Sequence, residues 1–383
     1  MWRHIASNAL TLLIVFAFLL GGMILWGQRQ YVAEGPLEEQ ICLRVERGSN
    51  VARVSRKLEA EGAVTSGTIF RLGMDYGDKS DQLKAGSYRI PVAASMAEIS
   101  EIVIKGVSNC GTEVIYNIGV AQMQVIIRDL DPATNDYVEL AKFAPASEEA
   151  PVAMQTALAD AGTRYSVRVV PGVTSWQVRE GLVQVGLLEG ELAEVPPEGM
   201  LAPDSYEIRK GDDRATLLQE MQAAQEVRLA AAWESRDRTV PLASPEEALV
   251  LASIIEKETG VPDERRQVAS VFVNRLKQGM RLQTDPTVIY GVTEGRGVLG
   301  RGLRQSELRG ETPYNTYVID GLPPGPIANP SRASLEAAVN PDETDYIFFV
   351  ADGTGGHAFA ITLEEHNANV RKWREIEAQR SGD

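Results

Sequence analysis

The chain has 383 residues, 44% of them hydrophobic and 24% charged, a mixture that excludes a short peptide, a collagen and a disordered tail. Its 38 basic and 53 acidic residues give a net charge of −15, which disfavours nucleic acid as a partner because like charges repel. At roughly 100–200 residues per domain, this length predicts two or three compact units.

Residues 5–26 are predicted to form a transmembrane anchor. They contain no charged side chain, and at about 1.5 Å per residue they make a helix of roughly 33 Å, which is enough to cross a bilayer. A cleaved signal peptide would have an apolar core of about 7–15 residues with small residues before the cut, whereas Gln28, Arg29 and Tyr31 follow this segment. We therefore expect an uncleaved anchor, preceded by a cytoplasmic tail of residues 1–4.

The orientation of the anchor is only weakly encoded, because Arg3 and Arg29 balance each other on its two sides. The short tail leaves the folded mass after the anchor, beginning with a polar linker over residues 27–40. That mass carries Cys42 and Cys110, for which two interpretations stay open. They are buried small hydrophobic residues, or they form a disulfide if the domain is extracytoplasmic.

A compact βααβ-like module is predicted over residues 41–106. Residues 42–45 and 85–90 have the pattern of strands, and residues 51–61 and 95–104 have that of helices with apolar residues at i+3 and i+4 spacing.

Two segments of less certain role follow this module. Residues 107–165 alternate like strands in their first half and favour a helix over 151–161, but they suggest no chemistry, so we treat them as an insertion of unknown role. Residues 166–243 are expected to form a second module and a connector. Their opening repeats the strand, turn and helix spacing of the first module 124 residues later.

A helix from about residue 244 to 259 carries the most informative acidic residue. Ser244 is a capping residue, and Pro245 occupies the first helical position. Leu251, Ile254 and Glu258 share one face, whereas Glu256 points about 200° away from Glu258. The sequence therefore places the Glu258 carboxyl on the face directed at the core.

A carboxyl among large aliphatic side chains is unfavourable to ionise, so it stays protonated to higher pH and can act as a general acid near neutrality. Glycosidic bond cleavage needs such an acid, and most glycosidases add a second carboxylate that is not obvious after this helix. The alternative role for Glu258 is an ion pair at the helix end with Arg265 or Arg266.

The region after this helix combines proline-rich loops with amide and phenol groups. A second helix is predicted over residues 262–278, ended by Gly279. The loops at 281–286, 312–317 and 321–330 could hydrogen-bond sugar hydroxyls and N-acetyl groups or stack on sugar rings. Ordinary turns are the alternative for any one of these loops.

In residues 251–329, and more loosely in 43–105 and 166–373, the chain resembles the endolytic murein transglycosylases of the YceG-like family. The resemblance rests on four motifs in order: Ala252-Ser253-Ile254-Ile255-Glu256-Lys257-Glu258-Thr259, Val271-Phe272-Val273-Asn274-Arg275-Leu276, Met280-Arg281-Leu282-Gln283-Thr284-Asp285-Pro286-Thr287-Val288-Ile289-Tyr290, and Tyr314-Asn315-Thr316-Tyr317 with Gly321-Leu322-Pro323-Pro324. Residues 107–165 are longer than the usual link between modules in this family.

The resemblance implies an α+β fold with one transmembrane helix, a LysM-like glycan-binding module at 41–106, and a mixed α/β catalytic domain at 244–383 with a lysozyme-like active-site helix. It implies a single-pass protein of the cytoplasmic (inner) membrane, with the catalytic domain on the periplasmic side. Its partners would be peptidoglycan glycan strands, and contacts with peptidoglycan synthases stay open.

The family is in turn similar to lysozyme-related lytic transglycosylases, whose three motifs fall here on Glu258-Thr259, Leu282-Gln283 and Tyr314-Asn315. The resemblance thus implies that Glu258 is the catalytic residue, in agreement with the helix-face argument. It implies a glycan-binding role for seven residues: Gln283, Asp285, Tyr290, Tyr314, Asn315, Thr316 and Asn329.

The implied reaction uses one carboxylate. Glu258 would protonate the glycosidic oxygen and then deprotonate the C6 hydroxyl of the same N-acetylmuramic acid, which closes a 1,6-anhydro ring and limits strand length. The alternatives are a lysozyme-type muramidase that uses water, and a non-catalytic glycan-binding scaffold. No cofactor or metal is expected, because His357, His366 and Asp352 fit no zinc spacing.

Overall fold

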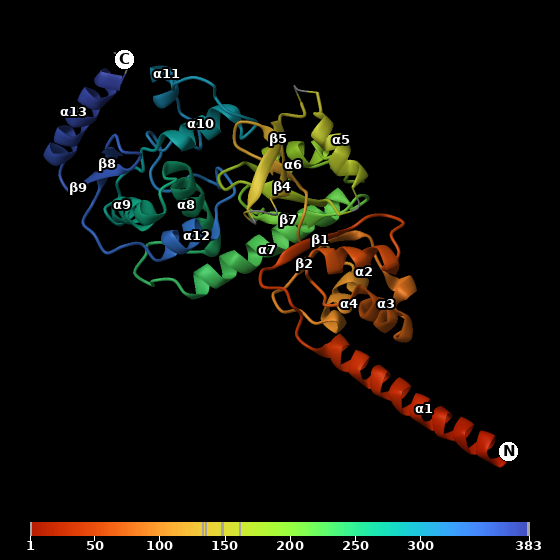
Figure 1. The fold of residues 1–383 in the computed structure, drawn as a ribbon. Helices are drawn as coiled ribbons and strands as arrows, with labels where there is room; N and C mark the ends of the chain where they lie inside the picture. Colours follow the sequence, from red (N-terminus) through yellow and green to blue (C-terminus); the bar gives the residue numbers. More distant parts are fainter. Residues whose placement is uncertain (1, 132–133, 135, 147–148, 161, 381–383) are drawn as a thin grey trace. The chain divides into compact units, whose positions relative to one another are not determined.

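The computed structural model describes residues 2–131, 134, 136–146, 149–160 and 162–380, with the side chains of residues 2–10 left out (Figure 1). Residue 1 of the predicted tail and several positions of the predicted insertion therefore lie outside the described residues. The fold mixes helices and sheets, which confirms the predicted α+β class. The chain divides into two compact units: Met1–Ile115 with Ile126–Phe143 and Glu149–Tyr165, and Tyr116–Val125 with Ala144–Glu148 and Ser166–Asp383.

The first helix, α1 (Trp2–Val32), is longer than the predicted anchor. It continues to Val32, through the first residues of the linker that we expected over 27–40. No proline occurs between Trp2 and Val32 to interrupt the helix, and Gly35 and Pro36 follow its end. By length and composition, Thr11–Val32 could cross a membrane.

The module after α1 contains both predicted strands and both predicted helices, together with a further helix, α3 (Gly67–Tyr76), that the sequence pattern did not predict. Strands β1 (Ile41–Val45) and β2 (Gly86–Ile90) pair antiparallel, with Leu43 opposite Tyr88. Helices α2 (Val51–Ala60) and α3 lie between the strands in the sequence, and α4 (Met96–Lys105) follows β2. A capping side chain begins each helix and an apolar stripe of each helix is buried in one core.

Cys42 and Cys110 form a disulfide. Of the two interpretations that the sequence left open, the structure therefore selects the covalent one. The bond ties β1 to the segment that follows α4, and Cys110 is fully buried.

A five-stranded sheet has the strand order β5-β4-β3-β6-β7. Its strands are β3 (Glu113–Ile118), β4 (Met123–Leu130), β5 (Tyr137–Phe143), β6 (Arg164–Val169) and β7 (Ser205–Ile208). The strand pattern predicted in the first half of residues 107–165 is confirmed. The helix predicted over residues 151–161 is α5 (Val152–Ala159), and the last predicted residue, Ala161, lies outside the described residues.

The remaining elements belong to the larger unit. They are α6 (Ser175–Gln184), α7 (Arg214–Glu234), α8 (Pro245–Glu258), the 3-10 turn η2 (Pro262–Glu264), α9 (Arg265–Lys277), α10 (Asp285–Thr293), α11 (Gln305–Leu308), α12 (Arg332–Val339), the antiparallel strands β8 (Phe348–Ala351) and β9 (His357–Ala360), and α13 (Leu363–Arg380). The helix predicted over 262–278 thus begins as a 3-10 turn at Pro262. It ends as predicted, with Gly279 in the left-handed conformation.

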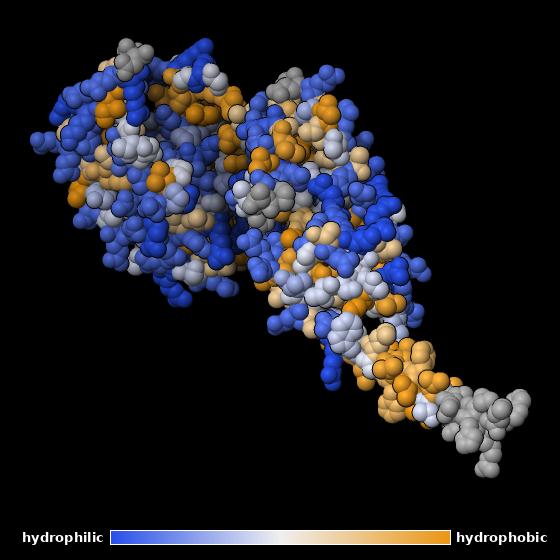
Figure 2. Space-filling view, in the orientation of Figure 1, coloured by the Kyte–Doolittle hydropathy of each residue, from blue (hydrophilic) through white to orange (hydrophobic). Residues whose placement is uncertain are grey.

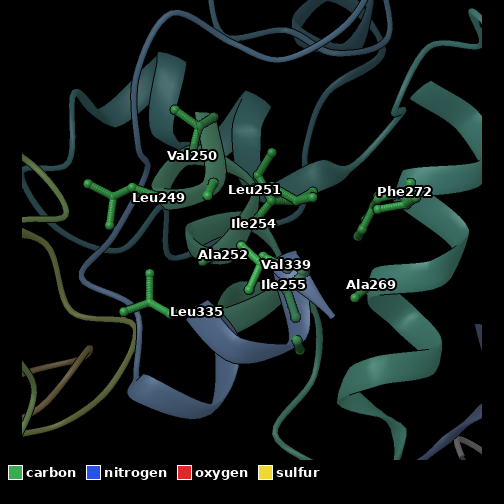
Figure 3. Close-up of a cluster of buried hydrophobic side chains, with 14 of the residues drawn as sticks. Leu249, Val250, Leu251, Ala252, Ile254, Ile255, Ala269, Phe272, Leu335 and Val339 are labelled. Carbon is green, nitrogen blue, oxygen red and sulfur yellow. The ribbon is translucent and has the colours of Figure 1, made fainter. Parts of the chain in front are cut away.

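Helix α8 is the centre of this unit. Every residue from Ala248 to Ile255 is buried, so α8 is a core helix rather than an amphipathic surface helix. Figure 3 shows its side chains between α12, which contributes Leu335 and Val339, and α9, which contributes Ala269 and Phe272. This packing fixes the end of α8, where Glu258 lies.

Candidate active site

Glu258 is the last residue of α8, and its position is fixed from both ends of the helix. Ser244 accepts a hydrogen bond from the Glu247 backbone, and Pro245 occupies the first turn. The following residue, Thr259, is extended and donates its backbone N–H to Ile255. The carboxyl therefore projects where the helix stops and irregular backbone begins.

Burial raises the pKa of Glu258, and the neighbouring Asp285 raises it further. A hydrogen bond from Thr284 and the charges of His357 and Arg275 act in the opposite direction. Glu258 as a whole residue is partly exposed at the end of α8, although its carboxyl lies in a largely buried environment. These two properties together suit an acid that must stay protonated and still reach a substrate.

Thr284 holds the Glu258 carboxyl: its hydroxyl donates to Oε1 of Glu258. Thr284 itself is buried, and its backbone N–H donates to the Thr316 hydroxyl at 3.0 Å. Thr287 extends the network, with 2.8 Å between its hydroxyl and that of Thr316. The Thr284 residue that donates to Glu258 is thus held in place by further buried hydrogen bonds.

The residue before Thr284 has a strained backbone. Gln283 has φ of 50°, in the left-handed region that residues with a Cβ atom avoid. Its backbone N–H donates to the Thr316 carbonyl at 3.1 Å, which helps to hold this conformation, and its side chain is exposed. Strain next to a carboxyl of raised pKa is typical of functional sites.

Arg275 and Tyr317 complete the surroundings of Glu258. The Arg275 guanidinium is buried and donates to the backbone carbonyls of Leu282 and Ile347, so it fixes the loop before Gln283. The Tyr317 hydroxyl donates to Asp285 at 2.6 Å, and burial first, then this carboxylate, raises the pKa of the phenol. Asp285 is thereby held beside the acid.

The alternative role as an ion-pair partner is not what the structure shows. In the part of the chain that the structure describes, no salt bridge includes Glu258, and Arg266 pairs with Asp342 at 2.8 Å. Glu256, two residues before Glu258, accepts hydrogen bonds from the backbone and hydroxyl of Ser331, which caps α12. Glu256 is thus engaged in the scaffold, on the other side of the helix, as the helix geometry predicts.

The seven residues expected to contact glycan fall into two groups. Gln283 and Asp285 are exposed next to Glu258, and Tyr290 and Tyr314 are half-buried with ring centroids 4.9 Å apart. The other three residues are fully buried: Asn315, Thr316 and Asn329.

The two buried amides are used by the protein itself. The Asn315 amide group donates to the backbone carbonyls of three residues and its oxygen accepts from the Tyr317 N–H. The Asn329 amide donates to the Val173 carbonyl at 3.0 Å and accepts from the Leu201 N–H at 2.9 Å. In this structure both side chains shape the backbone around the site and offer no free group to a ligand.

Sequence reasoning missed two residues. Thr284 lies in a loop that the sequence had singled out, and its position before Asp285-Pro286 at a helix start was a usable signal. Glu198 gave no local signal. It accepts hydrogen bonds from the Ser175 N–H at 2.8 Å and from the Tyr290 hydroxyl at 3.2 Å, and burial raises its pKa.

Comparison with known proteins fixes the family. The model of the YceG-like family matches residues 43–372. The chain belongs to the YceG-like family. The resemblance carried by the α8 motif and the loops after it is thereby confirmed.

Two relatives carry the name endolytic murein transglycosylase. That of Streptococcus pneumoniae (strain D39 / NCTC 7466) is 27% identical over 386 residues, which cover 96% of this chain and 65% of that protein. That of Bacillus subtilis (strain 168) is 26% identical over 356 residues, which cover 93% of this chain and 91% of that protein. The YceG-like chain thus spans 65% of the length of its pneumococcal relatives.

A crystal structure of a YceG-like protein from Listeria monocytogenes is also similar. It is 26% identical to this chain, covers 86% of it and 99% of the Listeria chain, and has a TM-score of 0.46.

His357 and His366 of this YceG-like chain each contact another side chain of the protein. The Nδ1 atom of His357 lies 2.9 Å from the Glu264 carboxylate, and the backbone N–H of His357 donates to the same carboxylate. His366 stacks on Phe348 with ring centroids 5.1 Å apart. Among the described residues, no group of three His, Cys, Asp or Glu side chains could hold a metal ion.

Proposed function

We propose that this YceG-like chain is an endolytic lytic transglycosylase that cleaves the β-1,4 bond between N-acetylmuramic acid and N-acetylglucosamine in nascent peptidoglycan strands. The observation that carries the proposal is the state of Glu258, a carboxyl whose burial raises its pKa, on a residue that is partly exposed at the end of α8. The names of the pneumococcal and Bacillus relatives support the class of substrate.

In the proposed reaction Glu258 acts first as an acid. Because Oε1 accepts the Thr284 hydroxyl, the acidic proton is carried by Oε2. This proton goes to the glycosidic oxygen as the bond to C1 of N-acetylmuramic acid breaks. The C6 hydroxyl of the same sugar then attacks C1 and gives its proton to the Glu258 carboxylate, so the acid is restored and a 1,6-anhydro end is formed.

The environment of Glu258 suits both halves of this cycle. Burial and Asp285 favour the protonated acid before cleavage, whereas the Thr284 hydroxyl, Arg275 and His357 favour the carboxylate that follows it. A single group can act as acid and then as base when its two protonation states are stabilised by different neighbours. One carboxylate suffices in this proposal because the tethered C6 hydroxyl, and not a water activated by a second carboxylate, attacks C1.

We assign the glycan contacts to the accessible members of the predicted set. Gln283 and Asp285 offer exposed polar groups beside the acid, and Tyr290 and Tyr314 offer aromatic faces. Asn315, Thr316 and Asn329 act in this proposal by holding the loops that present these groups.

We also propose that α1 anchors the chain in the cytoplasmic membrane with the folded part outside it. The apolar stretch Thr11–Val32 is long enough, and the disulfide between Cys42 and Cys110 is typical of an oxidising compartment. The βααβ order of the first module supports a LysM-like glycan-binding role. A module of this kind would hold a glycan strand near the membrane that α1 spans.

The test is digestion of purified sacculi with the full-length protein and two variants. Glu258→Gln should remove cleavage, because a neutral amide cannot donate the proton. Glu256→Gln is the matched control on the same helix, and it should keep the activity although it weakens the cap of α12. Retained cleavage by Glu258→Gln would contradict the assignment of the acid.

Analysis of the released sugar ends separates the candidate activities. A transglycosylase leaves 1,6-anhydro ends, whereas a muramidase leaves reducing ends that are heavier by one water. If both the parent protein and Glu258→Gln bind sacculi without cleaving them, the chain is a glycan-binding scaffold.

A further inference from the structure

The smaller unit contains an apolar hollow where α1 passes α3. Its volume is about 770 Å³, and its walls are mainly hydrophobic. Six of the residues that line it are Met23, Ile24, Val32, Ile69, Leu72 and Tyr76. In Figure 1, α3 lies next to the C-terminal end of α1, and Figure 2 shows hydrophobic residues gathered along α1.

The two helices meet at a glycine. A Cβ atom on Gly73 would lie 2.2 Å from the ring of Tyr31, so only glycine allows this approach. On either side of the contact, α3 presents Leu72 and Tyr76, which are 56% and 86% exposed. Since they lie four residues apart on one helix face, they form an uncovered apolar surface that continues the surface of α1.

The position of the hollow along α1 indicates which environment contacts this surface. The apolar stretch Thr11–Val32 makes a helix of roughly 33 Å, slightly more than the hydrocarbon core of about 30 Å. Met23 to Val32 form the end of this stretch that is closer to the folded module. A bilayer crossed by α1 would therefore place the hollow at the boundary between acyl chains and headgroups.

The types of side chain around the hollow fit that boundary. Trp26 and Tyr31 on α1 and Tyr76 on α3 are aromatic residues of the kind enriched at membrane interfaces, and Lys79 lies nearby. The Tyr31 hydroxyl is buried and has no hydrogen-bond partner among the described residues.

We propose that the hollow between α1 and α3 holds a phospholipid of the bilayer that α1 spans, so that α3 lies at the membrane surface with Leu72 and Tyr76 in contact with lipid. This inference rests on the membrane anchor proposed above and is independent of the chemistry at Glu258. It makes the first module a membrane-bound element with a fixed face toward the lipid, rather than a domain on a free tether.

The test uses the full-length chain in nanodiscs of phosphatidylethanolamine and phosphatidylglycerol. Leu72→Cys and Tyr76→Cys are labelled with a polar maleimide. Arg71→Cys is the matched control, because Arg71 is exposed and points about 100° to 140° away from these two side chains around α3. The native cysteines are joined in the disulfide and do not compete for the label. We expect labelling at least about tenfold slower at positions 72 and 76 than at 71, after normalisation to the unfolded chain.

A fluorophore at each of the same positions then shows whether lipid or protein contacts the surface at Leu72 and Tyr76. Lipids that carry a nitroxide near the glycerol should quench it at positions 72 and 76 and leave it unquenched at 71. Equal labelling at all three positions in nanodisc-bound protein would overturn the proposal. Slow labelling without quenching would overturn it too, since a protein surface such as a second copy of the chain would then be the cover.

Failure of the protein to enter nanodiscs would reject the anchor and this inference together. The activity on sacculi is measured separately on the same preparation, so such a failure is distinguishable from failure of the proposed enzyme.

Discussion

The hydrogen bond from Thr284 to Glu258 can be removed with little change of shape. In Thr284→Val the backbone bonds of residue 284 to Thr316 and Thr287 remain, because they use its N–H and carbonyl groups. The bond stabilises the ionised carboxylate, so its loss raises the pKa of Glu258 and extends the range of pH over which the acid is protonated.

The magnitude follows from the type of bond. A hydrogen bond to a charged group contributes about 1.5–3 kcal/mol, and at 1.36 kcal/mol per pKa unit its loss should move the alkaline limb of the pH profile up by roughly one to two pH units. The maximal rate should fall, because the carboxylate needed for the second half of the reaction is less stable and Oε1 is no longer held.

The assay is the release of glycan ends from sacculi as a function of pH. Thr287→Val is the matched control: it removes a buried hydroxyl from the same network, one that contacts Thr284 and Thr316 but not Glu258. It should lower stability and leave the alkaline limb in place. An unchanged limb in Thr284→Val, or an equal shift in both variants, would refute this account of the acid.

Four further predictions follow from individual side chains. Burial raises the pKa of Glu258 above its unfolded value, so the ionised acid destabilises the fold as pH rises, and Glu258→Gln should raise the melting temperature near neutral pH but not at about pH 4, below the unfolded pKa. Glu198→Ala should cost about 1–3 kcal/mol of stability, because it leaves the N–H of Ser175 unpaired, and it should raise KM. Glu198→Gln should keep most of the stability and a KM close to that of the parent protein. Chemical denaturation and kinetics would measure the two effects. Gln283→Gly should stabilise the fold by about 1 kcal/mol and lower activity, since it relieves the left-handed strain but removes the amide; a loss of stability would show that the strain is not there. Replacing both Cys42 and Cys110 by serine should cost about 3–4 kcal/mol, because their bond closes a loop with a sequence separation of 68, and an unchanged unfolding midpoint would argue against the bond in solution.

Much of the local structure could be predicted because local rules fix it. The start of α8 follows from a cap residue and a proline, and the end of α9 follows from Gly279 in the left-handed conformation. The position of Glu258 relative to Glu256 follows from the 100° rotation per residue of any α-helix. Such features depend on neighbours within about one helical turn, which the sequence contains directly.

The end of α1 and the state of the cysteines were harder to predict. Absence of charge marks an apolar core but not the last helical residue, so the helix continues to Val32 beyond the predicted boundary. Cys42 and Cys110 are 68 residues apart, and whether two thiols meet depends on how the strands between them pair.

The sequence by itself determined which carboxyl faces the core, that the chain mixes helices with strands, and that the ordered motifs around Glu258 match the YceG-like family. Only the tertiary structure showed that Thr284 holds that carboxyl, that Asn315 and Asn329 are buried in the scaffold, and that Glu198 meets Tyr290 across 92 residues of sequence. The physical reason is the range of the interactions. Helix caps and helix faces are set by adjacent residues, whereas desolvation and hydrogen bonding of a buried group are set by whichever distant segments the fold packs around it.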